Sequence, residues 1–290
     1  MSYWIMADIG CDLPKSYADR YERLQILPMP YRMEGEDRLY SLGDELRSPE
    51  FYAKLAAGHQ ATTSQIPVAT YYEAIKAVVE KGGEVLVLTL SSGISGTHQS
   101  AQMARSMLLE TYPNAKVLVV DSLCASLGFG LLLHHVLQNR AQGMSLQENA
   151  RWAMDNCQRV NHWFTVDDLN FLFRGGRVTR STALLGGMLR IKPVMRVNYE
   201  GKLAPHEKVQ GRKHSLKNLA DKAIALSNPQ AGQACFISHG NCEDEAKYVA
   251  GLIRKGLPKV GEVLISPCGA IIGAHSGPGT MAVFFLADKR

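Results

Sequence analysis

A loop rich in hydroxyl groups and glycines follows the apolar run 85–90 and precedes a stretch with helical spacing. Its sequence, residues 91–96, is Ser-Ser-Gly-Ile-Ser-Gly. A loop of this kind directs unpaired backbone N–H groups and the positive end of a helix dipole toward one point. The segment therefore predicts an anion site contacted by Ser95 and Gly96, with Ser92 at its rim. The alternative is that these hydroxyls only cap the helix.

The residue types of this loop limit the anion that it can hold. The loop lacks the Lys of the G-x-x-x-x-G-K-[ST] nucleotide motif, and it does not contain a G-x-G-x-x-G fingerprint. These absences disfavour a nucleotide polyphosphate. A single carboxylate needs only two or three well-placed donors and no dedicated cation, so it fits the loop better.

Hydroxyl side chains gather at two further places that should meet this loop. Residues 62–65, Thr-Thr-Ser-Gln, precede Pro67, which suits the first turn of a helix. Two strand-to-helix loops of one parallel sheet converge at its carboxyl edge, so we expect this cluster to join the anion site rather than only to cap a helix. Ser122 follows the apolar run 116–120 and should lie at the rim of the same cleft.

The segment 8–14 carries two carboxylates, Asp8 and Asp12, directly after the first apolar run. Paired carboxylates in that position can hold Mg²⁺. No third hard ligand stands nearby in the sequence, and Asp12-Leu-Pro14 also forms an ordinary turn into a helix. We therefore favour a structural role for this loop and predict neither a metal site nor a cofactor.

Two glycine-rich segments stand out in the second half, at 174–177 and 273–279. Glycines at this density mark tight backbone turns close to a ligand or an interface. Arg177 can pair with a carboxylate, a phosphate or a partner protein, and its alternative role is a surface salt bridge. His275 can donate to a ligand carboxylate, although a lone His is more often a structural residue.

The pattern of apolar residues predicts the elements that carry these side chains. In the first half, short apolar runs alternate with helical spacing, as in a mostly parallel sheet with helices on both faces. The second half is richer in strands and has a hairpin turn at 198–201. We expect an α/β fold with a parallel-sheet domain at 1–160 and an α+β domain with a mixed or antiparallel sheet at 161–290. The expected strands are 4–7, 25–31, 85–90, 116–120, 162–166, 191–197, 202–209, 234–239, 262–266 and 281–286, and the expected helices are 48–57, 67–80, 97–109, 125–140, 145–157 and 212–226.

Composition narrows the class of protein. The 290 residues are 46% hydrophobic, which is enough for a substantial core, and the net charge of +5 is scattered rather than gathered into a basic tract. This disfavours a nucleic-acid partner. We see no secretory signal and no long apolar run, and we expect a cytoplasmic protein that is monomeric by default. The six cysteines form neither a C-x-x-C pair nor a zinc-ligand cluster, so we expect reduced thiols.

Several segments, taken together and in order, resemble the DegV family over essentially the whole chain. No single segment carries the resemblance, but their common order makes it specific. The segments are Cys11-Asp-Leu-Pro14, Thr63-Ser-Gln65, Leu90-Ser-Ser-Gly-Ile-Ser-Gly-Thr97, Asp121-Ser122, Asp167-Asp-Leu169, Gly175-Gly-Arg177, Ile191-Lys-Pro193 and Ala274-His-Ser-Gly-Pro-Gly279.

The resemblance implies a two-domain protein that binds a long-chain fatty acid between its domains. It also implies a non-catalytic, acyl-carrying subunit of bacterial fatty acid kinase, which presents the carboxylate to a separate ATP-binding subunit. Carried onto matching positions, Thr63 and Ser95 contact the carboxylate and His275 supports them. Arg177 then lies nearby or at the contact with the kinase, and transient contact with a membrane is compatible with a lipid ligand.

The chain departs from the family pattern at two places. Hydroxyls common in the first loop of the family are missing at Ala7, Ile9 and Gly10, which argues against a ligand role for that loop. Ile66-Pro67 replaces the commoner Pro-Ser, which shifts the expected helix start by one residue.

Two other functions stay open at the level of sequence. One is a serine hydrolase that uses Ser95 with His275 and Asp121, although Gly-Ile-Ser-Gly-Thr departs from the G-x-S-x-G pattern. The other is a lipid-sensing regulatory module.

Overall fold

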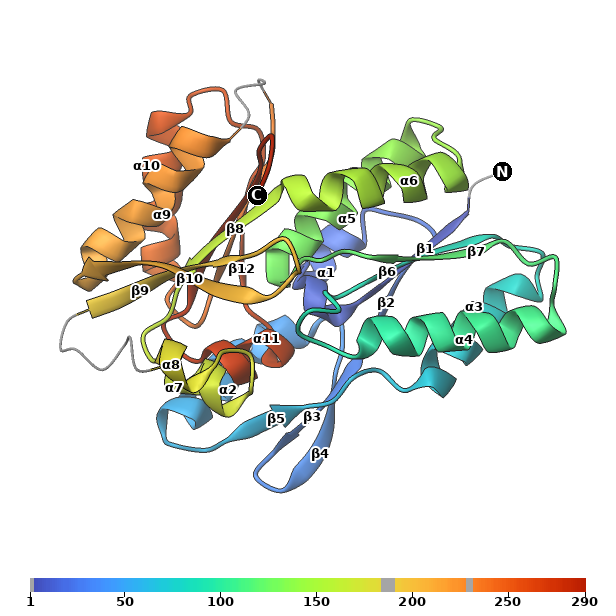
Figure 1. Cartoon of the computed structure of the whole chain (residues 1–290), viewed down its shortest axis with the longest axis horizontal. Coiled ribbons are helices and arrows are strands. Elements are labelled where there is room, and N and C mark those ends of the chain that lie inside the picture. Colours follow the sequence, from blue (N-terminus) through green and yellow to red (C-terminus); the bar gives the residue numbers. More distant parts are fainter. Residues whose placement is uncertain (1–2, 184–190, 228–231) are drawn as a thin grey trace.

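A computed structural model describes residues 3–183, 191–227 and 232–290 (Figure 1). Four parallel strands form its first sheet, in the order β2-β1-β6-β7. The strands are β1 (Trp4–Asp8), β2 (Leu24–Leu27), β6 (Val85–Thr89) and β7 (Val117–Asp121). Every residue of β6 is buried, because helices cover both faces of the sheet. The parallel sheet predicted for the first half is confirmed.

Helices α3 (Val68–Val79) and α4 (Thr97–Thr111) cover one face of this sheet, and α5 (Ser126–Ala141) and α6 (Leu146–Asn156) cover the other (Figure 1). Helix α5 also packs against the second sheet, so almost all of its sides are buried. A helix that is apolar all round is expected in such a place. The 3-10 helices are Ile9–Cys11, Asp44–Arg47 and Cys157–Arg159, and α1 is Lys15–Ala18.

The prediction of a single strand over 25–31 is wrong. Pro28 has no N–H to donate, and the chain divides there into β2 of the parallel sheet and β3 (Met29–Met33) of a separate sheet. This small antiparallel sheet has the order β4-β3-β5, with β4 (Glu36–Tyr40) and β5 (Ala61–Thr63), and α2 (Ser48–Ala56) lies between them in the chain. Glu34 and Gly35 both have positive φ and form the tight hairpin turn before β4.

Six strands form the mixed second sheet, in the order β10-β9-β8-β13-β11-β12. They are β8 (Val160–Thr165), β9 (Ile191–Val197), β10 (Leu203–Gln210), β11 (Cys235–His239), β12 (Val263–Pro267) and β13 (Met281–Leu286). The pair β11–β12 is parallel and the other pairs are antiparallel, including the predicted hairpin of β9 and β10. The mixed sheet expected for the second half is confirmed.

The described helices of the second half include four that were not predicted, of which α10 (Glu243–Gly256) and α11 (Ala270–Ser276) are the longest. The predicted α9 (Arg212–Leu226) lies beside α10 on the outer face of the mixed sheet (Figure 1). Helix α10 has an acidic first turn and a basic last turn, a charge pattern that favours a helix and that was available in the sequence. The short helices α7 (Asn170–Arg174) and α8 (Arg180–Ala183) follow β8.

Strand β13 separates two apolar cores. Ala282, Phe284 and Leu286 belong to the core that continues through α5 to the parallel sheet. The alternate residues Met281 and Val283 belong to a second core under α9 and α10, and so does Phe285. Because side chains alternate along a strand, one short strand serves both cores. In the part of the chain that the structure describes, no helix is both long and apolar enough to cross a membrane.

Candidate functional site

A cavity of about 280 Å³ lies where β5, the β6–α4 loop and α11 approach the inner face of the mixed sheet. Its volume is just below the usual range of small-molecule sites, roughly 300–1,000 Å³. The mixed sheet contributes side chains that alternate along its strands, such as Phe164 on β8 and Ala282 and Phe284 on β13. Apolar side chains from the β6–α4 loop, α7 and α11 extend this lining, so much of the cavity wall is apolar.

Five of the residues predicted from the sequence line this one cavity. They are Thr63 on β5, Ser95 and Gly96 in the β6–α4 loop, Arg177 after α7, and His275 on α11. Their placement differs from the expectation in one respect, because Thr63 does not follow a strand of the parallel sheet. It lies on β5 of the small antiparallel sheet, opposite Tyr31. Two different sheets therefore bring the hydroxyl clusters together.

His275 holds the Thr63 hydroxyl, with 2.7 Å between its Nε2 and Thr63 Oγ1. Burial, followed by the nearby Arg177 guanidinium, lowers the pKa of His275 to about 4, so the ring is neutral at pH 7. Its Nδ1 has no hydrogen-bond partner among the described residues and faces Gly175, where a Cβ would overlap it. When the hydrogen of the neutral ring is on Nε2, the unpaired Nδ1 is an acceptor rather than a donor. In this tautomer Nε2 donates to Thr63 Oγ1.

This tautomer determines what Thr63 can offer to a ligand. When Thr63 Oγ1 accepts from His275, its own hydrogen is free to be donated into the cavity. His275 therefore acts by positioning the Thr63 hydroxyl. Gly175 permits this packing, and that is a physical reason for the glycine in the 174–177 segment.

The β6–α4 loop is supported from behind by the second half of the chain. Ser91 Oγ donates to the Gly201 carbonyl over 2.8 Å, and a Cβ at Gly93 would lie 2.5 Å from the Glu200 carbonyl oxygen. Both contacts are with the turn between β9 and β10. Within the loop, Ser95 Oγ donates to Thr97 Oγ1 over 3.0 Å. That bond is local, so the Ser95 hydroxyl can rotate toward a ligand.

Arg177 joins this loop to the opposite side of the cavity. Its Nε donates to the Ile94 carbonyl over 3.2 Å, and its Nη1 donates to the Gly175 carbonyl over 2.5 Å. Burial lowers the pKa of Arg177, and no carboxylate among the described residues forms an ion pair with it. A half-buried guanidinium with unused donors at the cavity wall favours an anionic ligand.

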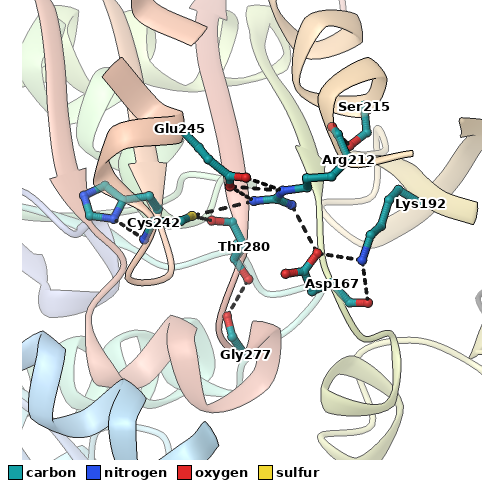
Figure 2. A network of polar contacts seen from close by, with 9 residues as sticks. Asp167, Lys192, Arg212, Ser215, Cys242, Glu245, Gly277 and Thr280 are labelled. Carbon is teal, nitrogen blue, oxygen red and sulfur yellow. Dashed lines mark hydrogen bonds and ion pairs between the residues drawn. The ribbon is translucent and has the colours of Figure 1, made fainter. Parts of the chain in front are cut away.

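A polar network anchors the segment that carries Arg177 (Figure 2). Asp167, two residues after the end of β8, accepts from Lys192 Nζ over 2.7 Å and lies 3.5 Å from Arg212 Nη1. Arg212 also pairs with Glu245 of α10, and its guanidinium approaches Cys242 Sγ at 3.7 Å. The start of this segment is thereby tied to β9, α9 and α10.

Ser92 and Ser122 do not line the cavity. Ser92 is exposed, and its backbone N–H donates to Asp121 Oδ1 over 3.2 Å. Ser122 is fully buried, and its hydroxyl is used in a turn with Cys124. The prediction that Ser122 lies at the rim is therefore wrong, because the chain turns inward after β7.

The carboxylates of the first loop are buried and have structural partners. Asp8 accepts from the backbone N–H groups of Gly10 and Leu90. Asp12 accepts from Ser126 Oγ over 2.6 Å and from the Gly269 N–H over 3.0 Å, so it ties the first loop to α5 and to the start of α11. These contacts support the structural role favoured from the sequence.

Replacing Asp12 with Asn should make the stability less dependent on pH. Burial raises the pKa of Asp12 to about 7, whereas an unfolded Asp titrates near 4. Between these values the folded state binds more protons than the unfolded state, so stability should fall as pH rises from about 4 to about 7, by at most about 1.4 kcal/mol per pH unit for this group. Urea unfolding across that range tests this, with Asp244→Asn on the surface as the control. Parallel curves for Asp12→Asn and the wild type would contradict it.

The three residues considered for a serine hydrolase do not form a hydrogen-bonded triad. Ser95 Oγ donates to Thr97, His275 is bonded to Thr63, and Asp121 accepts from the backbone N–H groups of Ser92 and Leu123. A triad requires the serine to meet the histidine and the histidine to meet the carboxylate. This geometry disfavours a serine hydrolase.

The fold and the cavity define an α/β protein with a parallel and a mixed sheet, in which an apolar cavity ends in hydroxyl and guanidinium donors. Residues 2–288 match the family model described as "Uncharacterised protein, DegV family". The chain belongs to the DegV family, as its sequence motifs predicted.

Relatives cover the chain from end to end. A DegV domain-containing protein of Clostridium perfringens is 38% identical over 289 residues, which is 99% of this chain and 98% of the relative. A solved structure described as "Fatty Acid Binding of a DegV family Protein from Thermus thermophilus" has a TM-score of 0.87 at 26% identity, covering 99% and 100% of the two chains. The Fatty Acid Kinase (Fak) B3 protein of Streptococcus pneumoniae, loaded with linoleic acid, has a TM-score of 0.83 at 22% identity over 99% and 100% of the chains, and this likeness establishes a shared fold.

Proposed function

We propose that this protein binds one long-chain fatty acid, with its carboxylate at Thr63 and Ser95 and its acyl chain along the apolar walls of the cavity. The observation that carries the proposal is the convergence of Thr63, Ser95, His275 and Arg177 at one apolar cavity. The relative from Thermus thermophilus, whose structure is described as showing fatty acid binding, supports a fatty acid as the ligand of this protein.

The polar groups are suited to a carboxylate. Thr63, held by His275, and Ser95 each supply one hydroxyl hydrogen, and Gly96 lines the same cavity. Charge-assisted hydrogen bonds of this kind are stronger than neutral ones. The neutral His275 adds no charge, so Arg177 is the cation that balances the ligand.

The apolar walls are suited to an acyl chain between the two units of the fold, which we place at 1–160 and 161–290. Each buried methylene contributes about 0.8 kcal/mol before ordering costs. The mixed sheet supplies one wall, through β8 and β13, and α11 supplies another. Several methylenes against these walls are enough to retain a poorly soluble ligand.

We further propose that the protein is a non-catalytic carrier that presents the carboxylate to a separate fatty acid kinase subunit in the cytoplasm. In that reaction a carboxylate oxygen attacks the γ-phosphorus of ATP, the bond to the β-phosphate breaks, and ADP leaves with the formation of an acyl phosphate. The family resemblance supports this partner. Arg177 lies at the cavity wall with unused donors, which supports the proposal that it stabilises the charge of the incoming phosphoryl group.

The ligand can be identified directly. Mass spectrometry of an organic extract from the purified protein should show an equimolar long-chain fatty acid such as palmitate or stearate. After removal of lipid, titration with palmitate should restore one ligand per chain. An extract without fatty acid, combined with failure of the stripped protein to bind palmitate, would refute the proposal.

A further inference from the structure

Four buried hydroxyl side chains line the cavity without belonging to the proposed carboxylate contacts. They are Ser126 at the start of α5, Ser238 on β11, Ser276 at the end of α11 and Thr280 before β13. All are buried, with exposed fractions of 5%, 0%, 6% and 3%. Burying a hydroxyl is unfavourable unless it finds a partner. A plain saturated chain offers none, so any hydrogen-bonding capacity that the protein leaves unused at these four hydroxyls needs a separate explanation.

The strand register places these hydroxyls in a connected strip. Ser238 pairs with Ala282 across β11 and β13, and Thr280 precedes Ala282 by two residues, so Thr280 projects to the same face as its diagonal neighbour. Ser126 Oγ lies 3.0 Å from Ser238 Oγ. The strip therefore adjoins the apolar wall formed by Ala282 and Phe284, along which the acyl chain is proposed to lie.

The hydrogen bonds of the strip leave unused capacity. Ser126 has one hydrogen for its two neighbours, Asp12 and Ser238, so when it donates to Asp12 the Ser238 hydroxyl donates to Ser126. Thr280 donates to the Gly277 carbonyl over 2.8 Å. Each of these three oxygens can still accept. Ser276 Oγ is buried and has no partner among the described residues, so it can both donate and accept.

From this pattern we infer that the strip formed by Ser126, Ser238, Ser276 and Thr280 is a second polar subsite, which receives a hydroxyl group carried by the acyl chain. The inference rests on the proposed function and extends its ligand class to hydroxylated fatty acids. A hydroxyl donates one hydrogen bond and accepts others, which matches free acceptors at Ser238 and Thr280 and a free donor at Ser276. A keto oxygen accepts only, and would leave the acceptors unused.

The test compares stearic acid with stearic acids that carry one hydroxyl near the carboxyl group, in mid-chain or close to the methyl end. Affinities are measured by calorimetry on the lipid-free full chain. We expect at least one hydroxylated acid to bind about threefold to tenfold more tightly than stearic acid, as one net hydrogen bond allows. If stearic acid binds and no hydroxylated acid binds more tightly, the subsite inference is wrong while the proposed function stands. If none of the acids binds, the proposed function fails.

Substitutions locate the effect. Ser276→Ala should abolish the advantage of the hydroxylated acid over stearic acid and should not destabilise the free protein, because it removes a hydroxyl without a partner. Thr280→Val should reduce the same advantage. Ser92→Ala, at an exposed serine outside the cavity, is the matched control and should retain it. An advantage that survives both Ser276→Ala and Thr280→Val would overturn the assignment.

Discussion

Replacing Thr63 with Val and Ser95 with Ala together should weaken the binding of palmitate by about a hundredfold or more. Each substitution removes a donor at the polar side of the cavity, and the loss of a partner for a buried charged group costs about 1 to 3 kcal/mol. Thr63→Val also removes the partner of His275 Nε2, and Nδ1 already has none among the described residues, so both ring nitrogens are then unpaired. The two losses should combine, and calorimetric titration of the lipid-free variants measures them.

Three controls make this prediction specific to the carboxylate. Ser92→Ala changes a hydroxyl of the same loop that does not line the cavity, so palmitate affinity should stay within twofold of the wild type, about 0.4 kcal/mol. Methyl palmitate has no charge, and the double substitution should affect its binding much less. Thermal unfolding shows whether the variants are folded. Unchanged palmitate affinity in a folded double variant would mean that the carboxylate lies elsewhere.

Replacing Arg177 with Met should reduce the formation of acyl phosphate about a hundredfold in the presence of a fatty acid kinase ATP-binding subunit. Phosphoryl transfer brings the negatively charged phosphoryl group to the carboxylate oxygen, and removing one preorganised donor at such a site typically costs roughly 10²–10³ in rate. Palmitate affinity should fall less, by under about tenfold, because the Thr63 and Ser95 hydroxyls bind the carboxylate before the reaction begins. Acyl-phosphate formation and palmitate titration are measured on the same preparations.

The neighbouring residues of this segment supply the comparisons. Arg177→Lys keeps the charge but loses the fork that reaches the Ile94 and Gly175 carbonyls, so its activity should be intermediate. Arg174→Met removes an exposed arginine that lies over the Phe171 ring and does not line the cavity, and it should leave activity unchanged. Wild-type rates with Arg177→Met would exclude the proposed role.

Most elements of the fold were predictable because their side chains repeat with the period of their secondary structure. Strands β9 and β13 and helix α9 have the predicted bounds, and the turn at 198–201 joins two strands as expected. Helix α11 was missed because seven residues are too few for the helical period to show. The small antiparallel sheet was missed because Pro28 divides an apolar run and β4 is mostly polar.

The partners of individual side chains depended on contacts far apart in the chain. The motifs identified Thr63, Ser95, Arg177 and His275, but not the bond between Thr63 and His275, which joins residues 212 positions apart. Nor did they indicate that Asp12 caps the start of α11, or that Ser126, Ser238, Ser276 and Thr280 share one cavity. Each of these single Ser and Thr residues resembles an ordinary cap or turn residue when only its neighbours in the sequence are visible.

The sequence by itself determined the family, the alternation of strands and helices, and the residue types able to hold an anion. Periodicity and local turn chemistry act over a few residues, so they are readable without the fold. Only the tertiary structure decided that Thr63, from a different sheet, lines the same cavity as Ser95, that Ser122 is buried, and that His275 is buried and neutral. Those properties depend on burial and on long-range packing, which set hydrogen-bond partners and pKa values once the chain has folded.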